Sequence, residues 1–136
     1  MLIRSACDRD LTAILEIQSG APEASQWDPG DYLIYDCRVA EESGAVVGFS
    51  LARRVADEEW EVLNLAVAAA FRRRGIGRRL LGDLLERRRG EFFLEVRESN
   101  RAARELYERA GFRTITKRLQ YYANPVETAI VMKLYS

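Results

Sequence analysis

The sequence predicts an α/β (α+β) fold, in which helices cover a mixed central sheet. Three observations support this prediction. The 136 residues have the length of one domain, so we expect a single domain over residues 1–136. Hydrophobic residues switch along the chain between the period of strands and the period of helices. The resulting order of elements, β-α-β-β-β-α-β-α-β-β, contains a strand-helix-strand unit. Two strands joined in this way are typically parallel neighbours in a sheet.

The first half of the chain predicts a strand, a helix and an antiparallel meander. Residues 2–5 read as a short strand, and hydrophobic residues recur at helical spacing after Asp8. A loop-forming segment from Gly20 to Asp31 has Trp27 as its only large apolar residue, and such a loop commonly lines a site. Three strands are expected next, at residues 33–40, 45–55 and 59–67.

The second half predicts a helix, a central strand, a second helix and a hairpin. Leucines at helical spacing mark one face of a helix that runs from Ile76 to about residue 89. The run FFLEV at residues 92–96 is almost continuously apolar, as in a central strand that is covered on both faces. Asn100 would cap the second helix, and Gly111 would end it. The last two strands are expected at residues 114–121 and 127–135.

The composition excludes several catalytic mechanisms. The chain has no histidine, which excludes a Ser-His-Asp triad, a Cys-His pair and an HExxH zinc helix. Catalysis would therefore use carboxylates, tyrosines or backbone groups, and we expect no metal. Cys7 and Cys37 show no CxxC spacing, so we interpret them as free thiols in a reducing cytoplasm. No segment resembles a signal peptide or a membrane span, so we expect a cytoplasmic protein without a membrane partner.

The net charge is zero, but the two signs are unevenly distributed along the chain. Residues 1–61 contain five arginines and thirteen acidic residues, a balance of −8. Residues 62–136 contain sixteen basic and eight acidic residues, a balance of +8. This charge division suits an enzyme that binds an anionic cofactor and an amine substrate. It is equally compatible with two halves of the chain that simply attract one another.

An arginine-rich turn, FRRRGIGRRLL at residues 71–81, lies between a predicted strand and a predicted helix. Its pattern Arg72-x-x-Gly75-x-Gly77 permits a tight turn that aims N–H groups and a helix N-terminus at an anion. The Gly-Lys-Ser/Thr of a P-loop is absent, and Leu80 replaces the third glycine of the dinucleotide fingerprint. This spacing leaves three interpretations open, namely phosphate binding, a solvated arginine face and a nucleic-acid contact.

Longer segments of the second half resemble one enzyme family. Residues 59–82 resemble the acetyl-CoA motif of the GNAT superfamily of N-acetyltransferases. Residues 94–112 resemble bacterial ribosomal-protein-alanine N-acetyltransferases of the RimI type, and so does the tail, with Tyr121-Tyr122 and residues 128–134. The first sixty residues match mainly in the order of their elements. The resemblance implies the GNAT fold, with six to seven strands, about four helices and two parallel strands splayed around acetyl-CoA.

The resemblance also implies a set of cofactor contacts. Backbone groups of three strand residues would meet the pantetheine arm and the acetyl carbonyl, and the turn would hold the pyrophosphate. Asn100 would contact the cofactor further along, although a helix cap explains this residue as well. The cofactor-binding residues that are implied are Leu65, Ala66, Val67, Arg72, Arg73, Arg74, Gly75, Ile76, Gly77, Arg78 and Asn100.

By the same resemblance, Glu95 would be the base that takes a proton from the amine, and Tyr107 the acid for the leaving thiolate. On sequence grounds alone, Glu95 also suits a structural ion pair with Arg97. Tyr107 on the apolar face of a helix also suits a core position. Four aromatic residues are candidates for the acceptor site, namely Trp27, Tyr32, Tyr121 and Tyr122.

Physical chemistry favours an α-amine as the acceptor. A free α-amino group has a pKa near 8 and a lysine a pKa near 10.4, so neutralising lysine at pH 7 costs about 3 kcal/mol more. We therefore expect the partner to be a protein N-terminus, such as that of a ribosomal protein, with a small-molecule amine as the alternative. A non-enzymatic module that senses acetyl-CoA or binds nucleic acid is a further alternative. We expect a monomer or a weak dimer without a nucleic-acid partner.

Overall fold

The structure, a computed structural model, describes residues 1–21, 26–123 and 125–135. Within these ranges one mixed sheet has the strand order β1-β2-β3-β4-β5-β7-β6. Its strands are β1 (Leu2–Ser5), β2 (Asp36–Glu42), β3 (Ala45–Ala56), β4 (Glu59–Val67), β5 (Glu91–Arg97), β6 (Arg113–Tyr122) and β7 (Glu127–Tyr135). The α-helices are α1 (Leu11–Ser19), α2 (Asp31–Ile34), α3 (Ile76–Arg87) and α4 (Arg101–Ala110). The predicted fold class is confirmed.

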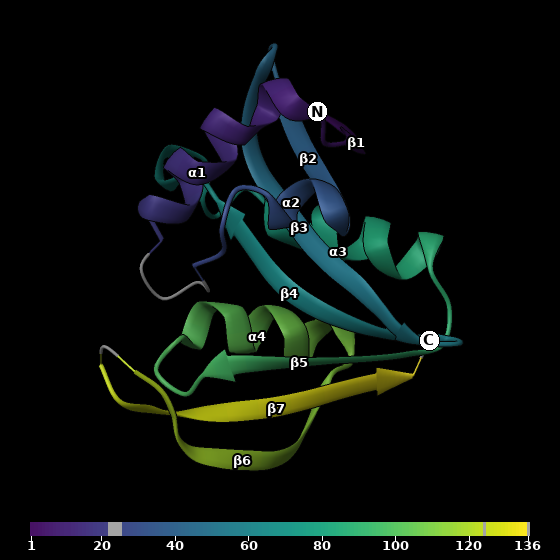
Figure 1. Cartoon of the computed structure of the whole chain (residues 1–136), viewed down its shortest axis with the longest axis vertical. Helices are drawn as coiled ribbons and strands as arrows, with labels where there is room; N and C mark the ends of the chain where they lie inside the picture. Colours follow the sequence, from purple (N-terminus) through teal and green to yellow (C-terminus); the bar gives the residue numbers. More distant parts are fainter. Residues whose placement is uncertain (22–25, 124, 136) are drawn as a thin grey trace.

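The helices cover both faces of the sheet (Figure 1). On one face, Ile14 of α1 and Tyr32 of α2 belong to a buried cluster with Phe49 of β3. On the other face, α3 and α4 contribute Leu84 and Tyr107 to a second buried cluster. Burying large apolar side chains of this kind stabilises the fold by roughly 2 kcal/mol each. This packing fixes α4 beside the middle of the sheet, where β4 and β5 meet.

β4 and β5 are parallel, as the helix between them predicts. Their pairing joins Glu59–Val62 to Glu91–Leu94 and ends there. β4 continues to Val67 and β5 continues to Arg97, and Figure 1 shows the two ribbons diverging over this stretch. Beyond the last pair, the facing edges of the two strands therefore lack the ladder hydrogen bonds that strands normally exchange.

The predicted start of the second strand is wrong. The strand expected at residues 33–40 begins at Asp36, because Asp31–Ile34 forms the single helical turn α2. The Asp31 N–H donates to the carbonyl of Asp28 at 3.0 Å, which winds the chain into this turn. The turn directs the Tyr32 ring into the core beneath α1. Tertiary packing therefore overrides the local strand pattern here.

The ends of α4 follow the predicted capping signals. The Asn100 side chain accepts a hydrogen bond from the Ala103 N–H at 3.2 Å, and Gly111 ends the helix with φ 108°. Residues 22–25 of the predicted loop and residue 124 of the final hairpin lie outside the described residues. In the part of the chain that the structure describes, no helix is long and apolar enough to cross a membrane.

Candidate active site

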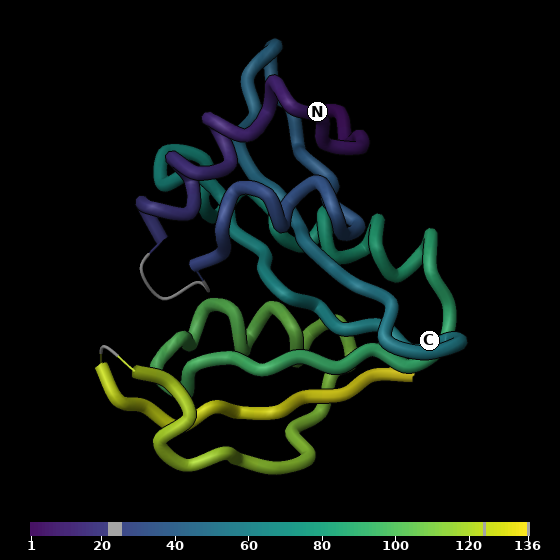
Figure 2. Tube along the Cα trace, viewed as in Figure 1, coloured from purple at the N-terminus to yellow at the C-terminus, as the bar shows by residue number. Residues whose placement is uncertain are grey.

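A pocket opens where the pairing of β4 and β5 ends. It is lined by Val62–Leu65 of β4, Glu95–Arg97 of β5, Asn100, Ala103 and Tyr107 at α4, and Tyr122 of β6. Figure 2 shows how these segments, which lie far apart in the sequence, meet around the two diverging strands. Five residues that the sequence singled out, Leu65, Glu95, Asn100, Tyr107 and Tyr122, thus line one pocket.

The Glu95 carboxylate is largely buried in this pocket, with 15% of its side chain exposed. Its Oε1 atom lies 3.3 Å from the Arg118 guanidinium of β6. Arg97 instead pairs with Glu127 at 3.4 Å, and its guanidinium lies 4.4 Å from the centre of the Tyr122 ring. The ion pair between Glu95 and Arg97 that the sequence left open is therefore replaced by two separate pairs.

Tyr107 belongs to the core and to the pocket. Only 6% of the residue is exposed, and its ring packs edge-on against Phe112 with the ring centres 5.5 Å apart. Burial raises the pKa of the Tyr107 hydroxyl well above its ordinary value of about 10. The phenol therefore keeps its proton at neutral pH and is able to donate it.

The turn before α3 has the conformation that its glycine-rich pattern predicts. Arg73 and Gly75 adopt positive φ angles of 64° and 77°. No group among the described residues accepts a hydrogen bond from the N–H groups of residues 73–78, which include Ile76 and Gly77 of the first helical turn. Because a helix N-terminus carries partial positive charge, these N–H groups form a cradle suited to an anion.

The arginine side chains of the turn are exposed, and none of them pairs with a carboxylate of the described residues. Arg72 braces the turn, because its Nε donates to the Val67 carbonyl at 3.2 Å. Arg74 lies 5.0 Å from the centre of a phenylalanine ring in the same turn. The positive charge of Arg73 and Arg78 therefore remains available to an anion.

The three β4 residues expected to contact the pantetheine arm differ in their surroundings. Leu65 lines the pocket, and its N–H donates to Oδ1 of Asn64 at 3.0 Å. The Val67 carbonyl accepts the hydrogen bond from Arg72. The Ala66 side chain is buried in the core beneath α1, so a ligand contact at this position would use the backbone, as expected.

Tyr32, one of the four aromatic residues expected at the acceptor site, is placed in the core instead. It is 0% exposed, its hydroxyl donates to the Gln18 side chain, and it accepts from Nδ2 of Asn64 at 3.3 Å. Tyr32 therefore has no exposed surface with which to contact an acceptor. Trp27 is half-buried, and its backbone N–H donates to Oε1 of Gln18 at 3.0 Å.

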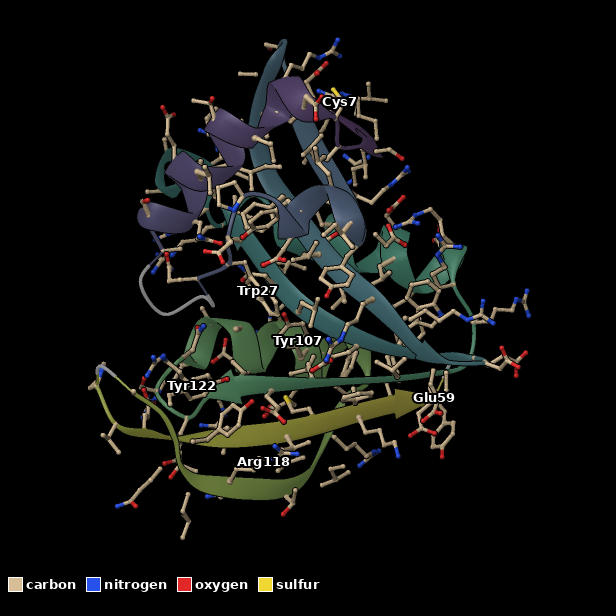
Figure 3. The ribbon with its side chains drawn as sticks, in the orientation of Figure 1. Cys7, Trp27, Glu59, Tyr107, Arg118 and Tyr122 are labelled. Carbon is tan, nitrogen blue, oxygen red and sulfur yellow. The ribbon has the colours of Figure 1, made fainter. Side chains whose placement is uncertain are left out.

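Tyr121 and Tyr122 end β6 beside the pocket, with their rings edge-on and 5.1 Å apart. Burial raises the pKa of Tyr122 to about 12. Tyr121 is about half exposed, and a side-chain hydrogen bond with the Glu95 carboxylate raises the pKa of its hydroxyl. Figure 3 labels Trp27, Tyr107 and Tyr122, which lie around α4 in this view.

Two residues of the site were not predicted. Asn64 is 5% exposed, lines the pocket and interrupts the apolar run VLNLAV, and this buried polar interruption is a signal that could have identified it. Arg118 pairs with Glu95, but nothing in its local sequence distinguishes it from the neighbouring basic residues. In the described ranges, no group of three or more cysteine, aspartate or glutamate residues could hold a metal ion.

Parallel strands that diverge beside a glycine-rich turn at a helix N-terminus are typical of GNAT acetyltransferases. The chain belongs to this family, since the model of the acetyltransferase (GNAT) family matches residues 7–112. Enzymes of the family use acetyl-CoA, and relatives of this chain are named as N-acetyltransferases. The chain is therefore an N-acetyltransferase.

Three known proteins illustrate the similarity. The chain is 30% identical over 147 residues to [ribosomal protein bS18]-alanine N-acetyltransferase of Haemophilus ducreyi, covering 98% of this chain and 99% of the relative. The crystal structure of the ribosomal-protein-S18-alanine N-acetyltransferase from Escherichia coli has a TM-score of 0.83 at 32% identity, covering 98% and 92% of the two chains. The yncA protein of Salmonella typhimurium, solved with its cofactor acetyl-CoA, has a TM-score of 0.83 at 25% identity, covering 99% and 93%.

Proposed function

We propose that this chain transfers the acetyl group of acetyl-CoA to the α-amine of a protein N-terminus, with Glu95 as base and Tyr107 as acid. One observation carries the proposal. Glu95 and Tyr107 line the same pocket as Asn100 and Tyr122, and this pocket begins where β4 and β5 part. A carboxylate and a protonated phenol beside one opening are the two groups that amine acetylation requires.

The chain has suitable groups to hold acetyl-CoA. The N–H groups of residues 73–78 and the guanidinium groups of Arg73 and Arg78 have no acceptor or carboxylate partner among the described residues, and they suit a pyrophosphate. The divergent edge of β4 at Leu65–Val67 suits the amide groups of a pantetheine arm, and Asn100 borders the same pocket. Bound acetyl-CoA supplies an acetyl thioester whose thiolate is a good leaving group.

The two side chains would balance the protons of the transfer. Glu95 takes one proton from the ammonium group of the acceptor, and the resulting amine forms the new C–N bond as the C–S bond breaks. Tyr107 gives its proton to the departing sulfur. The second proton that the nitrogen loses returns to Tyr107, so that only Glu95 must release a proton to solvent before the next cycle.

The acceptor class follows from basicity and from the relatives. Neutralising an α-amine at pH 7 costs about 3 kcal/mol less than neutralising a lysine, which suits a site with one carboxylate base. The names of the relatives from Haemophilus ducreyi and Escherichia coli specify the alanine of a ribosomal protein. The N-terminus of such a protein is therefore the first acceptor to test.

The proposal is tested with the purified protein, acetyl-CoA and a panel of acceptors. The panel compares peptides that begin with alanine and other residues, the same peptides blocked at the N-terminus but carrying a lysine, polyamines and aminoglycosides. We expect acetylation at the free α-amine, located by mass spectrometry. Preference for a small amine would overturn the proposed acceptor, and salt-sensitive nucleic-acid binding without stabilisation by acetyl-CoA would overturn the enzyme function.

A further inference from the structure

The end of β6 departs from a regular strand. Arg118 pairs with Ala129 and Tyr122 pairs with Glu127, so β6 has two more residues than β7 between these pairs. Within this bulge, Gln120 adopts a positive φ of 53°, which is uncommon for a residue other than glycine. Bulges of this kind re-aim side chains and occur preferentially beside active sites.

The bulge brings two consecutive tyrosines to the same side of the strand. In a regular strand, neighbouring side chains point to opposite faces. Tyr121 and Tyr122 instead contact one another, with ring centres 5.1 Å apart and planes at 78°. Tyr122 lines the pocket, and the Glu95 carboxylate raises the pKa of the Tyr121 hydroxyl beside it. The bulge therefore directs Tyr121 toward the base.

Arg118 contacts both members of this pair. Its Nη1 atom lies 3.3 Å from Oε1 of Glu95, and its guanidinium carbon lies 5.4 Å from the centre of the Tyr121 ring. The Arg118 side chain is 56% exposed, and an ion pair with so exposed a partner contributes little to the stability of a fold. A role in orienting the two side chains explains this arrangement better than a role in folding.

Two other carboxylates near the pocket pair with other arginines of the described residues. Glu127 pairs with Arg97, and Glu61 on β4 pairs with Arg53 on β3. Among the described residues, Arg118 is the cation that pairs with the carboxylate of Glu95.

We propose that Arg118 is a positioning residue that, together with Tyr121, holds the Glu95 carboxylate in place for the acceptor amine. This inference rests on the proposed function of Glu95.

The test measures kcat and KM for Arg118→Met with acetyl-CoA and an acceptor peptide. Because small displacements of a catalytic group are costly, we expect kcat to fall about tenfold while the KM for acetyl-CoA stays unchanged. In a Glu95→Gln background, the same substitution should cause no further loss, because there is no carboxylate left to orient. Lys117→Met is the matched control, since Lys117 is as exposed but pairs with Glu98 instead.

A wild-type kcat for Arg118→Met, or an equal loss in the Glu95→Gln background, would overturn the inference. A second measurement does not depend on activity. In the crystal structure of Arg118→Met, the Glu95 and Tyr121 side chains should separate, and an unchanged pair would contradict the positioning role. If the wild-type protein acetylates no acceptor, the proposed function fails, while this structural comparison still decides whether Arg118 orients Glu95.

Discussion

Val62 of β4 and Leu94 of β5 form the last pair that joins the two parallel strands. Every pocket residue contributed by β5 lies beyond that pair, beginning with Glu95, the next residue along the strand. Because strand pairing would satisfy the backbone groups of both edges, its end leaves polar strand edges next to a buried carboxylate. The position of this one pair therefore determines where a ligand is able to enter the sheet.

Replacing Glu95 by Gln should lower kcat at least a hundredfold and leave the acetyl-CoA affinity unchanged, because the amide keeps the shape but accepts no proton. Steady-state kinetics measure kcat. Isothermal titration calorimetry measures the affinity of the cofactor site, with the product CoA used in place of acetyl-CoA. Glu98→Gln is the control, since Glu98 is a nearby carboxylate that pairs with Lys117 outside the pocket. Full activity of Glu95→Gln would remove Glu95 from the mechanism.

Tyr107→Phe should lower kcat by about tenfold to a hundredfold, because the variant has no proton to give to the leaving sulfur. The raised pKa of Tyr107 also predicts a pH dependence. As the pH rises through about 10, where an ordinary tyrosine ionises, Tyr107 stays protonated, so its ionisation should not reduce the wild-type rate. Tyr135→Phe, which changes an exposed tyrosine, is the control. A wild-type kcat for Tyr107→Phe would contradict the assignment.

The double variant Arg73→Gln/Arg78→Gln should weaken acetyl-CoA binding about tenfold, because it removes two cations that no described carboxylate neutralises. Its effect should shrink as salt is added, since these side chains are exposed. Calorimetry at two salt concentrations measures both effects. Arg89→Gln supplies the comparison, because Arg89 is an exposed arginine just beyond the other end of α3. If the double variant and the wild type bound acetyl-CoA with equal affinity, the phosphates of acetyl-CoA would have to bind away from Arg73 and Arg78.

The sequence predicts most of the fold because each helix and strand has its own hydrophobic period. The diverging strands were expected from the family resemblance, since no local pattern encodes where a parallel pair ends. Two features of the site depend on contacts between distant residues. Tyr32 is buried because Gln18 and Asn64 satisfy its hydroxyl, and Arg118 of β6 pairs with Glu95 of β5 across the intervening strand β7. Neither contact has a signature in the residues that surround it in the sequence.

Two glycines, one inside α3 and one just beyond its end, should respond in opposite ways to a methyl group. At Gly82, inside α3, an added Cβ meets no atom within 4 Å, so Gly82→Ala should stabilise the protein by roughly 0.5–1 kcal/mol. At Gly90, φ is 116° and an added Cβ would lie 2.0 Å from the carbonyl oxygen of Glu58. Gly90→Ala should therefore destabilise the protein by more than about 3 kcal/mol.

Urea denaturation measures the free energies of unfolding of both variants. The affinity of Gly82→Ala for acetyl-CoA shows whether its cofactor site is intact.

The position of Gly90 matters to the site because the Glu91 N–H donates to the same Glu58 carbonyl at 2.8 Å. This hydrogen bond ties the start of β5 to the turn that precedes β4, and so it sets the register in which the two strands pair. A stable Gly90→Ala protein with unchanged activity would mean that this register is set elsewhere.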